Sequence, residues 1–138
     1  MRLGLMLLVQ VLALRLLTPC AFAADDPVHV ELNALETSDG RCRLTFVIEN
    51  KGKTAVESLK LDLALFNTEG AVYRRMLVDM APLRPAKTIV KTFSTEGDCA
   101  QLGSVLVNEI TACQPGDAAT CQDQLALSSR VKNVRFFK

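Results

Sequence analysis

The strongest constraint on the fold is an alternation of apolar and polar residues with a period of two. Its clearest stretch has four alternate leucines, Leu59, Leu61, Leu63 and Leu65. Leucine favours helices by propensity. On a helix, however, these side chains would scatter around the axis, whereas on a strand they all point to one side. The stretch therefore predicts a β-strand with one buried face.

The same alternation predicts further strands over residues 28–34, 42–48, 72–80, 88–93 and 105–113, and a last segment over 125–136. Turn residues separate these runs, and Pro82 and Pro85 exclude a regular central strand between two of them. Residues 100–103 fit either a strand or a single helical turn, and a polar loop is expected from residue 114. About seven short strands separated by turns predict an all-β, antiparallel, immunoglobulin-like sandwich.

The N-terminus has the three regions of a cleavable signal peptide. Met1-Arg2 is positive, residues 3–14 are almost entirely apolar, and Ala21-Phe22-Ala23 is a small-x-small cleavage site. We expect a signal peptide over residues 1–23 and one sandwich domain over 24–138. A retained membrane anchor is the alternative, but Arg15 and Pro19 leave the apolar run short of the ~20 residues that span a membrane. Acylation at Cys20 after Leu17-Thr18-Pro19 is a second alternative.

Charge indicates no nucleic-acid partner. The chain has 16 basic and 15 acidic residues, and Arg2 and Arg15 would leave with the signal, so the mature net charge is about −1. Both signs are scattered, without a basic block. The export signal predicts a periplasmic or secreted protein that has no membrane span after cleavage.

Four cysteines remain after cleavage, namely Cys42, Cys99, Cys113 and Cys121. An even number in an exported chain predicts two disulfides, and the spacings suit neither a redox Cys-x-x-Cys motif nor a zinc site. Four cysteines allow three pairings. If every connection reverses the chain, Cys42 and Cys99 lie at one end of the sandwich and Cys113 and Cys121 at the other. We therefore predict the pairs Cys42–Cys99 and Cys113–Cys121.

No constellation of residues predicts catalysis, a cofactor or a metal. The single histidine, His29, is interpreted as a solvent-facing residue on an edge strand. Met76 and Met80 could be imagined as copper ligands together with it, but on a strand they lie too far apart, and core packing is favoured. Paired carboxylates, a serine-hydrolase elbow and a phosphate loop are not found. We expect no enzyme.

One local cluster suits contact with a partner. Tyr and Arg are favoured interface anchors, and Tyr73-Arg74-Arg75 combines them. Because neighbouring strand residues point to opposite faces, only one of the arginines can share a face with a given apolar neighbour. Solvation of an exposed strand is the alternative interpretation of this cluster.

Two stretches resemble bacterial immunoglobulin-like and adhesion-type modules. Residues 46–52 resemble their strand followed by an Asn-x-Gly turn, and residues 83–88 resemble their Leu-x-Pro-Gly-x-Thr motif, with Ala86 in place of glycine. The mature chain, with its four cysteines and its Leu127-Ser128-Ser129-Arg130 tail, resembles a group of exported proteobacterial β-sandwich proteins often labelled as Tat pathway signal proteins. This chain lacks twin arginines, so that transport label does not carry over. The resemblance implies a sandwich and no catalytic residues.

These features favour a non-enzymatic module that binds another protein, such as a protein of the envelope, or another envelope component through its strand edges or end loops. An inhibitor-like module that projects the 113–121 loop into a hydrolase cleft is a second hypothesis, because a closed loop is pre-organised for binding. A small-ligand or metal carrier is a third.

Overall fold

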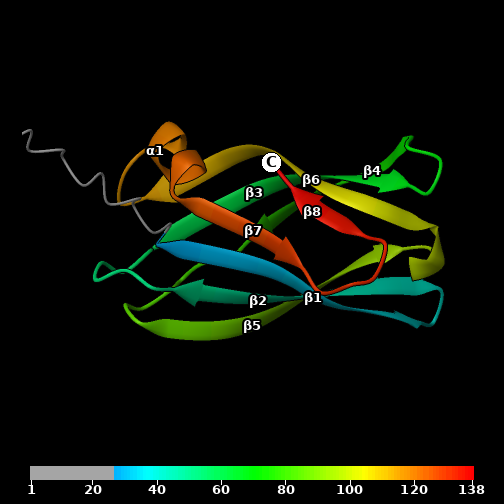
Figure 1. Cartoon of the computed structure of the whole chain (residues 1–138), viewed down its shortest axis with the longest axis horizontal. Coiled ribbons are helices and arrows are strands. Elements are labelled where there is room, and N and C mark those ends of the chain that lie inside the picture. Colours follow the sequence, from blue (N-terminus) through cyan, green and yellow to red (C-terminus); the bar gives the residue numbers. More distant parts are fainter. Residues whose placement is uncertain (1–26) are drawn as a thin grey trace, which may run out of the picture.

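A computed structural model describes residues 27–138, which form two stacked four-stranded sheets (Figure 1). The first sheet has the order β5-β2-β1-β7, with β5 Lys87–Glu96, β2 Arg41–Asn50, β1 Val28–Ser38 and β7 Leu125–Ser129. The second has the order β4-β3-β6-β8, with β4 Val72–Asp79, β3 Ser58–Asn67, β6 Leu102–Gln114 and β8 Arg135–Phe137. The all-β sandwich is confirmed, while the signal peptide, its cleavage site and Cys20 lie outside the described residues.

The core lies between the two sheets and consists of the alternate residues that the sequence pattern singled out. All four leucines of the β3 stripe are buried, and Leu44, Phe46 and Ile48 of β2 are buried opposite them. Burial of apolar surface is worth roughly 25 cal/mol per Å², so these stripes are the main source of stability. Phe46 contacts aromatic rings from two other strands, at centroid distances of 6.1 Å to Phe93 and 5.5 Å to Phe136.

The turn between β1 and β2 is formed by Asp39 and Gly40. Asp39 has a φ of 52° and Gly40 a φ of 69°, between the paired residues Ser38 and Arg41. Two successive positive φ angles define the type I′ turn, whose twist matches that of the flanking strands. The Asp-Gly pair therefore sets the register of the hairpin.

Ala86 also has a positive φ, of 52°, immediately before β5. This is the position at which the resembling modules carry glycine. A residue with a Cβ is destabilised by about 1–2 kcal/mol in this left-handed region. Glycine would avoid this strain, but part of the stabilisation would be lost because glycine has more conformational freedom in the unfolded chain.

We therefore expect Ala86→Gly to raise the free energy of unfolding by about 0.5–1 kcal/mol. Urea unfolding followed by circular dichroism measures it. Ala119→Gly, at an exposed helical position, is the control and should lower stability by about 1 kcal/mol. A loss of stability in both variants would contradict the strain at Ala86.

Two strand pairs are parallel, which differs from the antiparallel sandwich expected from the sequence. β7 pairs with β1 and β8 pairs with β6, both in parallel. The last segment also forms two strands instead of one, so residues 27–138 contain eight strands. When each connection reverses the chain, all odd-numbered strands run in one direction and all even-numbered strands in the other. β1 and β7 are therefore parallel as neighbours, and so are β6 and β8.

The structure has two short helices, one in a segment for which the sequence pattern predicted either strand or helix and one in a segment predicted as a loop. Cys99–Gln101 forms a 3₁₀ turn, η1, which decides the ambiguous segment in favour of helix, and β6 starts directly after it. Residues 118–123 were expected as a polar loop, but Ala118–Asp123 forms α1. Its signal is local: Asp117 is an N-cap residue, whose side chain accepts a hydrogen bond from Thr120 N.

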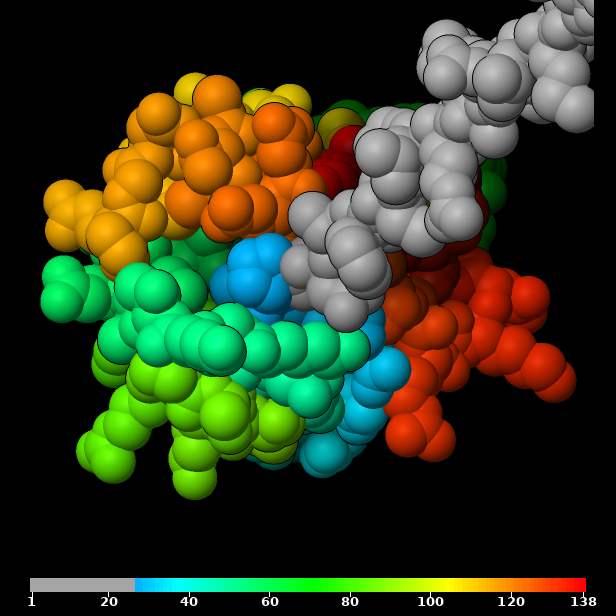
Figure 2. All heavy atoms as spheres, turned by 60° about the vertical axis from the view of Figure 1, so that its left-hand side comes forward, coloured from blue at the N-terminus to red at the C-terminus, as the bar shows by residue number. Residues whose placement is uncertain are grey.

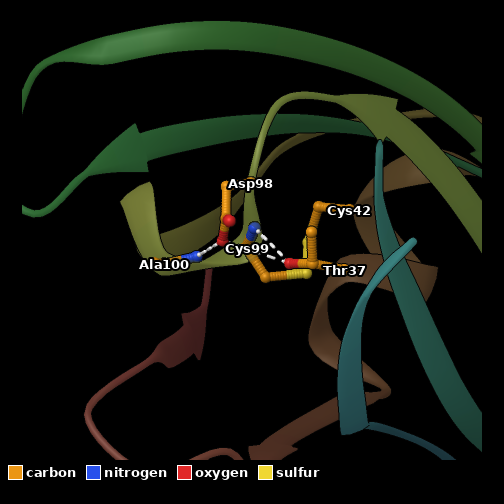
Figure 3. Close-up of a disulfide and its surroundings, with 5 residues drawn as sticks. All are labelled: Thr37, Cys42, Asp98, Cys99 and Ala100. Atoms are coloured by element: carbon orange, nitrogen blue, oxygen red, sulfur yellow. Dashed lines mark hydrogen bonds between the residues drawn. A yellow bond between two sulfur atoms is a disulfide. The ribbon is translucent and has the colours of Figure 1, made fainter. Parts of the chain in front are cut away.

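The predicted disulfide pairs are both confirmed and lie at opposite ends of the sandwich. Cys42–Cys99 joins the start of β2 to the turn before β6 and so links the two sheets (Figure 3). Thr37 Oγ1 accepts from Cys99 N at 3.0 Å and donates to Asp98 Oδ1 at 3.1 Å, while Ala100 N donates to the same Asp98 oxygen at 2.7 Å. These bonds hold the turn against the end of β1.

Cys113–Cys121 joins the end of β6 to α1. Cys121 lies within α1 and not at the start of a strand, and β7 begins only after this helix. We call this end the α1 end. Here β1 and β3 begin and β2 and β6 finish, as the registers Val28↔Asn50 and Ser58↔Gln114 show.

Candidate binding pocket

A cavity of about 440 Å³ opens at the α1 end, within the range of about 300–1,000 Å³ usual for ligand sites. Its apolar lining includes four residues at most 9% exposed, Val28, Leu59, Cys113 and Leu125. Its rim carries the exposed residues Lys53, Thr54, Ala55 and Thr120. In Figure 2 this end faces forward, with α1 (orange), the loop after β2 (green) and the start of β1 (blue) around the site. The site is therefore a concave surface with an apolar lining and a polar rim.

The first wall is the loop between β2 and β3, which Asn50 organises. This side chain is only 1% exposed. Its Nδ2 donates to the carbonyl of Thr54 at 2.9 Å and to that of Leu83 at 3.4 Å, and its Oδ1 accepts from Gly52 N at 2.9 Å. A buried amide that uses its donor and acceptor capacity in this way fixes the loop. The Asn-x-Gly motif noted in the sequence thus forms one side of the pocket.

The second wall is α1 with the chain on either side of it. The disulfide ties the helix to β6, and Asp117 caps its N-terminus. The backbone N–H of Thr120 lowers the pKa of Asp117, so the cap is charged at neutral pH. At the other end of the helix, Lys138 Nζ donates to the carbonyl of Leu125 at 2.5 Å and to that of Gln122. Covalent and polar contacts therefore hold this wall from both ends.

The cluster Tyr73-Arg74-Arg75 lies on β4, away from the pocket. Tyr73 is half-buried against the core, and burial raises its pKa. Arg74 pairs with Glu96 of β5 at 3.3 Å, whereas Arg75 pairs with Asp62 of β3. The hydrogen bond from Arg75, assisted by one from Asn108, lowers the pKa of Asp62. The two arginines thus serve different internal contacts and do not form one patch.

His29 does not lie on an edge strand, contrary to the sequence-based interpretation. β1 lies between β2 and β7, so His29 is half-buried on the outer face of its sheet. Its Nε2 lies 2.8 Å from Ser128 Oγ of β7, and Glu49 is its register partner on β2. The lining of the cavity at the α1 end includes none of these residues.

The methionines and the histidine are not brought together. Met80 is fully buried and Met76 packs against the core, whereas His29 lies on an outer face. Within residues 27–138, no group of three or more His, Cys, Asp or Glu side chains could hold a metal ion. No helix in this part of the chain has the length and apolar character needed to cross a membrane.

Three of the four edge strands, β5, β7 and β8, are poorly suited to pairing with another strand. β7 and β8 have five and three residues. β5 is longer, but Lys91 points inward between β5 and β4, where its Nζ donates to the carbonyls of Asp79, at 2.8 Å, and Ala81. Inward-pointing charges and short edge strands are devices that block edge-to-edge association. Pairing is thus disfavoured at these three edges, and the end loops are favoured over them as the surface that binds a partner.

Comparisons of the chain with protein-family models, with curated proteins and with solved structures give no match. The pocket therefore has to be interpreted from its own geometry. Sequence reasoning identified the 113–121 loop and the Asn50-Lys51-Gly52 turn separately, but it missed that they face each other. The signal that could have joined them is the predicted topology, which puts the end of β2 and the end of β6 at the same end of the sandwich.

Proposed function

We propose that the mature chain is a non-enzymatic, periplasmic or secreted module that binds a segment of another envelope protein in the pocket at the α1 end. The observation that carries this proposal is the cavity itself, an apolar site between two anchored walls. A pre-formed site lowers the cost of binding because its loops are already ordered. Two disulfides also suit an oxidising compartment outside the cytoplasm.

The concave shape favours this function over the inhibitor-like hypothesis. An inhibitor loop has to project into the cleft of an enzyme, whereas residues 113–121 here contribute Cys113, Pro115, Gly116, Thr120 and Cys121 to the lining of a cavity. A surface of this shape receives a segment of a partner. The small-ligand carrier shares the same cavity, so the experiment has to identify the bound molecule.

We also propose that the sandwich is immunoglobulin-like, on the basis of its strand order. The orders β5-β2-β1 and β4-β3-β6 match E-B-A and C′-C-F of immunoglobulin-like sandwiches. Cys42 on β2 and Cys99 beside β6 stand near the B and F strands, which a disulfide joins in antibody domains. The parallel strands β7 and β8 depart from that scheme.

Site-specific photo-crosslinking in the export compartment tests the proposed function. A benzoylphenylalanine at Thr120, on the rim, is expected to form a covalent adduct with a polypeptide. Ala55→Trp should fill the cavity mouth and abolish that adduct. Ala119→Trp is the matched control, because Ala119 is also exposed but does not line the pocket. Adducts that persist in Ala55→Trp, or that contain no polypeptide, would overturn the proposal.

A further inference from the structure

The described lining of the pocket has charge of one sign, while the charged cap Asp117 lies beside it in the wall that contains α1. Among the lining residues within 27–138, Lys53 has the only ionisable side chain, since Cys113 and Cys121 are joined in a disulfide. The neighbouring Lys51 lies 3.9 Å from Glu49, whereas Lys53 has no ion pair within the described chain. A pocket with a single exposed cation on its rim is complementary to a ligand with one negative charge.

Backbone groups of the same loop add to this preference. The hydrogen bonds formed inside residues 27–138 leave the N–H groups of Lys53, Thr54 and Ala55 without a partner. Successive backbone N–H groups form anion-binding concavities, and they capture C-terminal carboxylates in recurrent peptide-recognition modes. The cation and these N–H groups thus lie on one loop at the rim of the apolar cavity.

The remaining polar side chains distinguish a peptide from an acyl chain. The side chains of Thr54 and Gln124 make no hydrogen bond inside the described part of the chain, and both line the pocket. An extended peptide carries an N–H and a C=O on each residue that such groups can satisfy, whereas a fatty acyl chain carries neither. The lining is therefore better matched to a peptide backbone.

We propose that the pocket binds the free C-terminus of a partner polypeptide, with an apolar last side chain in the cavity and the α-carboxylate at Lys53 and the N–H groups of residues 53–55. This inference rests on the proposed function and specifies which segment of the partner is bound. An internal segment of the partner would have an uncharged peptide group next to Lys53 in place of the carboxylate.

Fluorescence anisotropy with synthetic peptide pools tests the inference on the full mature chain. The probes are fluorescein-labelled hexapeptide mixtures whose last residue is Leu, Phe or Asp, each as the free acid and as the amide. We expect the free acids ending in Leu or Phe to bind, and their amides to bind about tenfold more weakly. Lys53→Gln should weaken the free acids about tenfold and leave the amides unchanged. Lys51→Gln is the matched control, because Lys51 does not line the pocket.

The outcomes separate the inference from the proposed function. Equal binding of acids and amides that Ala55→Trp abolishes would overturn the C-terminal assignment and leave the pocket as the binding site. Binding that Ala55→Trp does not affect would overturn the proposed function. If no free-acid pool binds, or if dodecanoate binds in the pocket and the peptides do not, the inference is wrong and, in the second case, the ligand is a lipid acid.

Discussion

Replacing Cys42 and Cys99 together by alanine is expected to lower the free energy of unfolding by about 4 kcal/mol. The two cysteines are 57 residues apart, and a cross-link over a loop of that length removes much of the conformational freedom of the unfolded chain. Because domains of this kind are stable by about 5–15 kcal/mol in total, the loss is a large part of the net stability. Urea unfolding followed by far-ultraviolet circular dichroism measures it.

The second disulfide is the internal control for this experiment. Cys113 and Cys121 are only 8 residues apart, so the corresponding double alanine variant should lose about 2.5 kcal/mol. That variant should nevertheless bind a pocket ligand more weakly, because it frees one wall of the site. The chain-entropy account would be contradicted if removal of the short loop were the more damaging change.

Phe46→Ala is expected to lower the free energy of unfolding by about 3–5 kcal/mol. Phe46 is 1% exposed, and its ring contacts Phe93 of β5 and Phe136 of β8. Truncation therefore removes buried apolar surface and leaves a cavity among strands from both sheets. The same urea titration measures the effect, with circular dichroism at low denaturant showing that the variant still folds.

Two further substitutions serve as references for the loss of stability in Phe46→Ala. Phe46→Leu should cost less than Phe46→Ala, because it leaves a smaller cavity. Val90→Ala should change stability by no more than about 0.5 kcal/mol, since Val90 is 63% exposed on an outer face. A similar loss in Val90→Ala and Phe46→Ala would show that the aromatic cluster does not have the central role assigned to it.

Local residues determined several features of this protein without reference to the rest of the chain. The alternate leucines of β3 have to face one side of a strand, so the buried stripe could be predicted despite their helical propensity. Asp39-Gly40 specifies its own hairpin because both residues tolerate a positive φ. Chain reversal at each turn then limits which cysteines can meet, which is why both pairings followed from the sequence.

Tertiary structure alone decided which strands became neighbours. Pairing of β7 with β1 makes β1 an inner strand, half-buries His29 and brings Ser128 to it from 99 residues away. The two strands run in the same direction, so this pairing is parallel. Nothing in the residues around His29 signals this, because period-two patterning states which face of a strand is buried and not which strand lies beside it.

The predicted topology places the two loops of the pocket at one end of the sandwich, but only the folded chain decided that they enclose a cavity. Its walls come from residues 50–56 and 113–125, and neither segment has a chemical motif that points to the other. The sequence by itself determined a β-sandwich with two disulfides, because the alternation of apolar and polar residues and the preferences of turn residues act over a few neighbouring positions. The site depended on how the ends of β2 and β6 come together, which is set by packing of the two sheets over the whole chain.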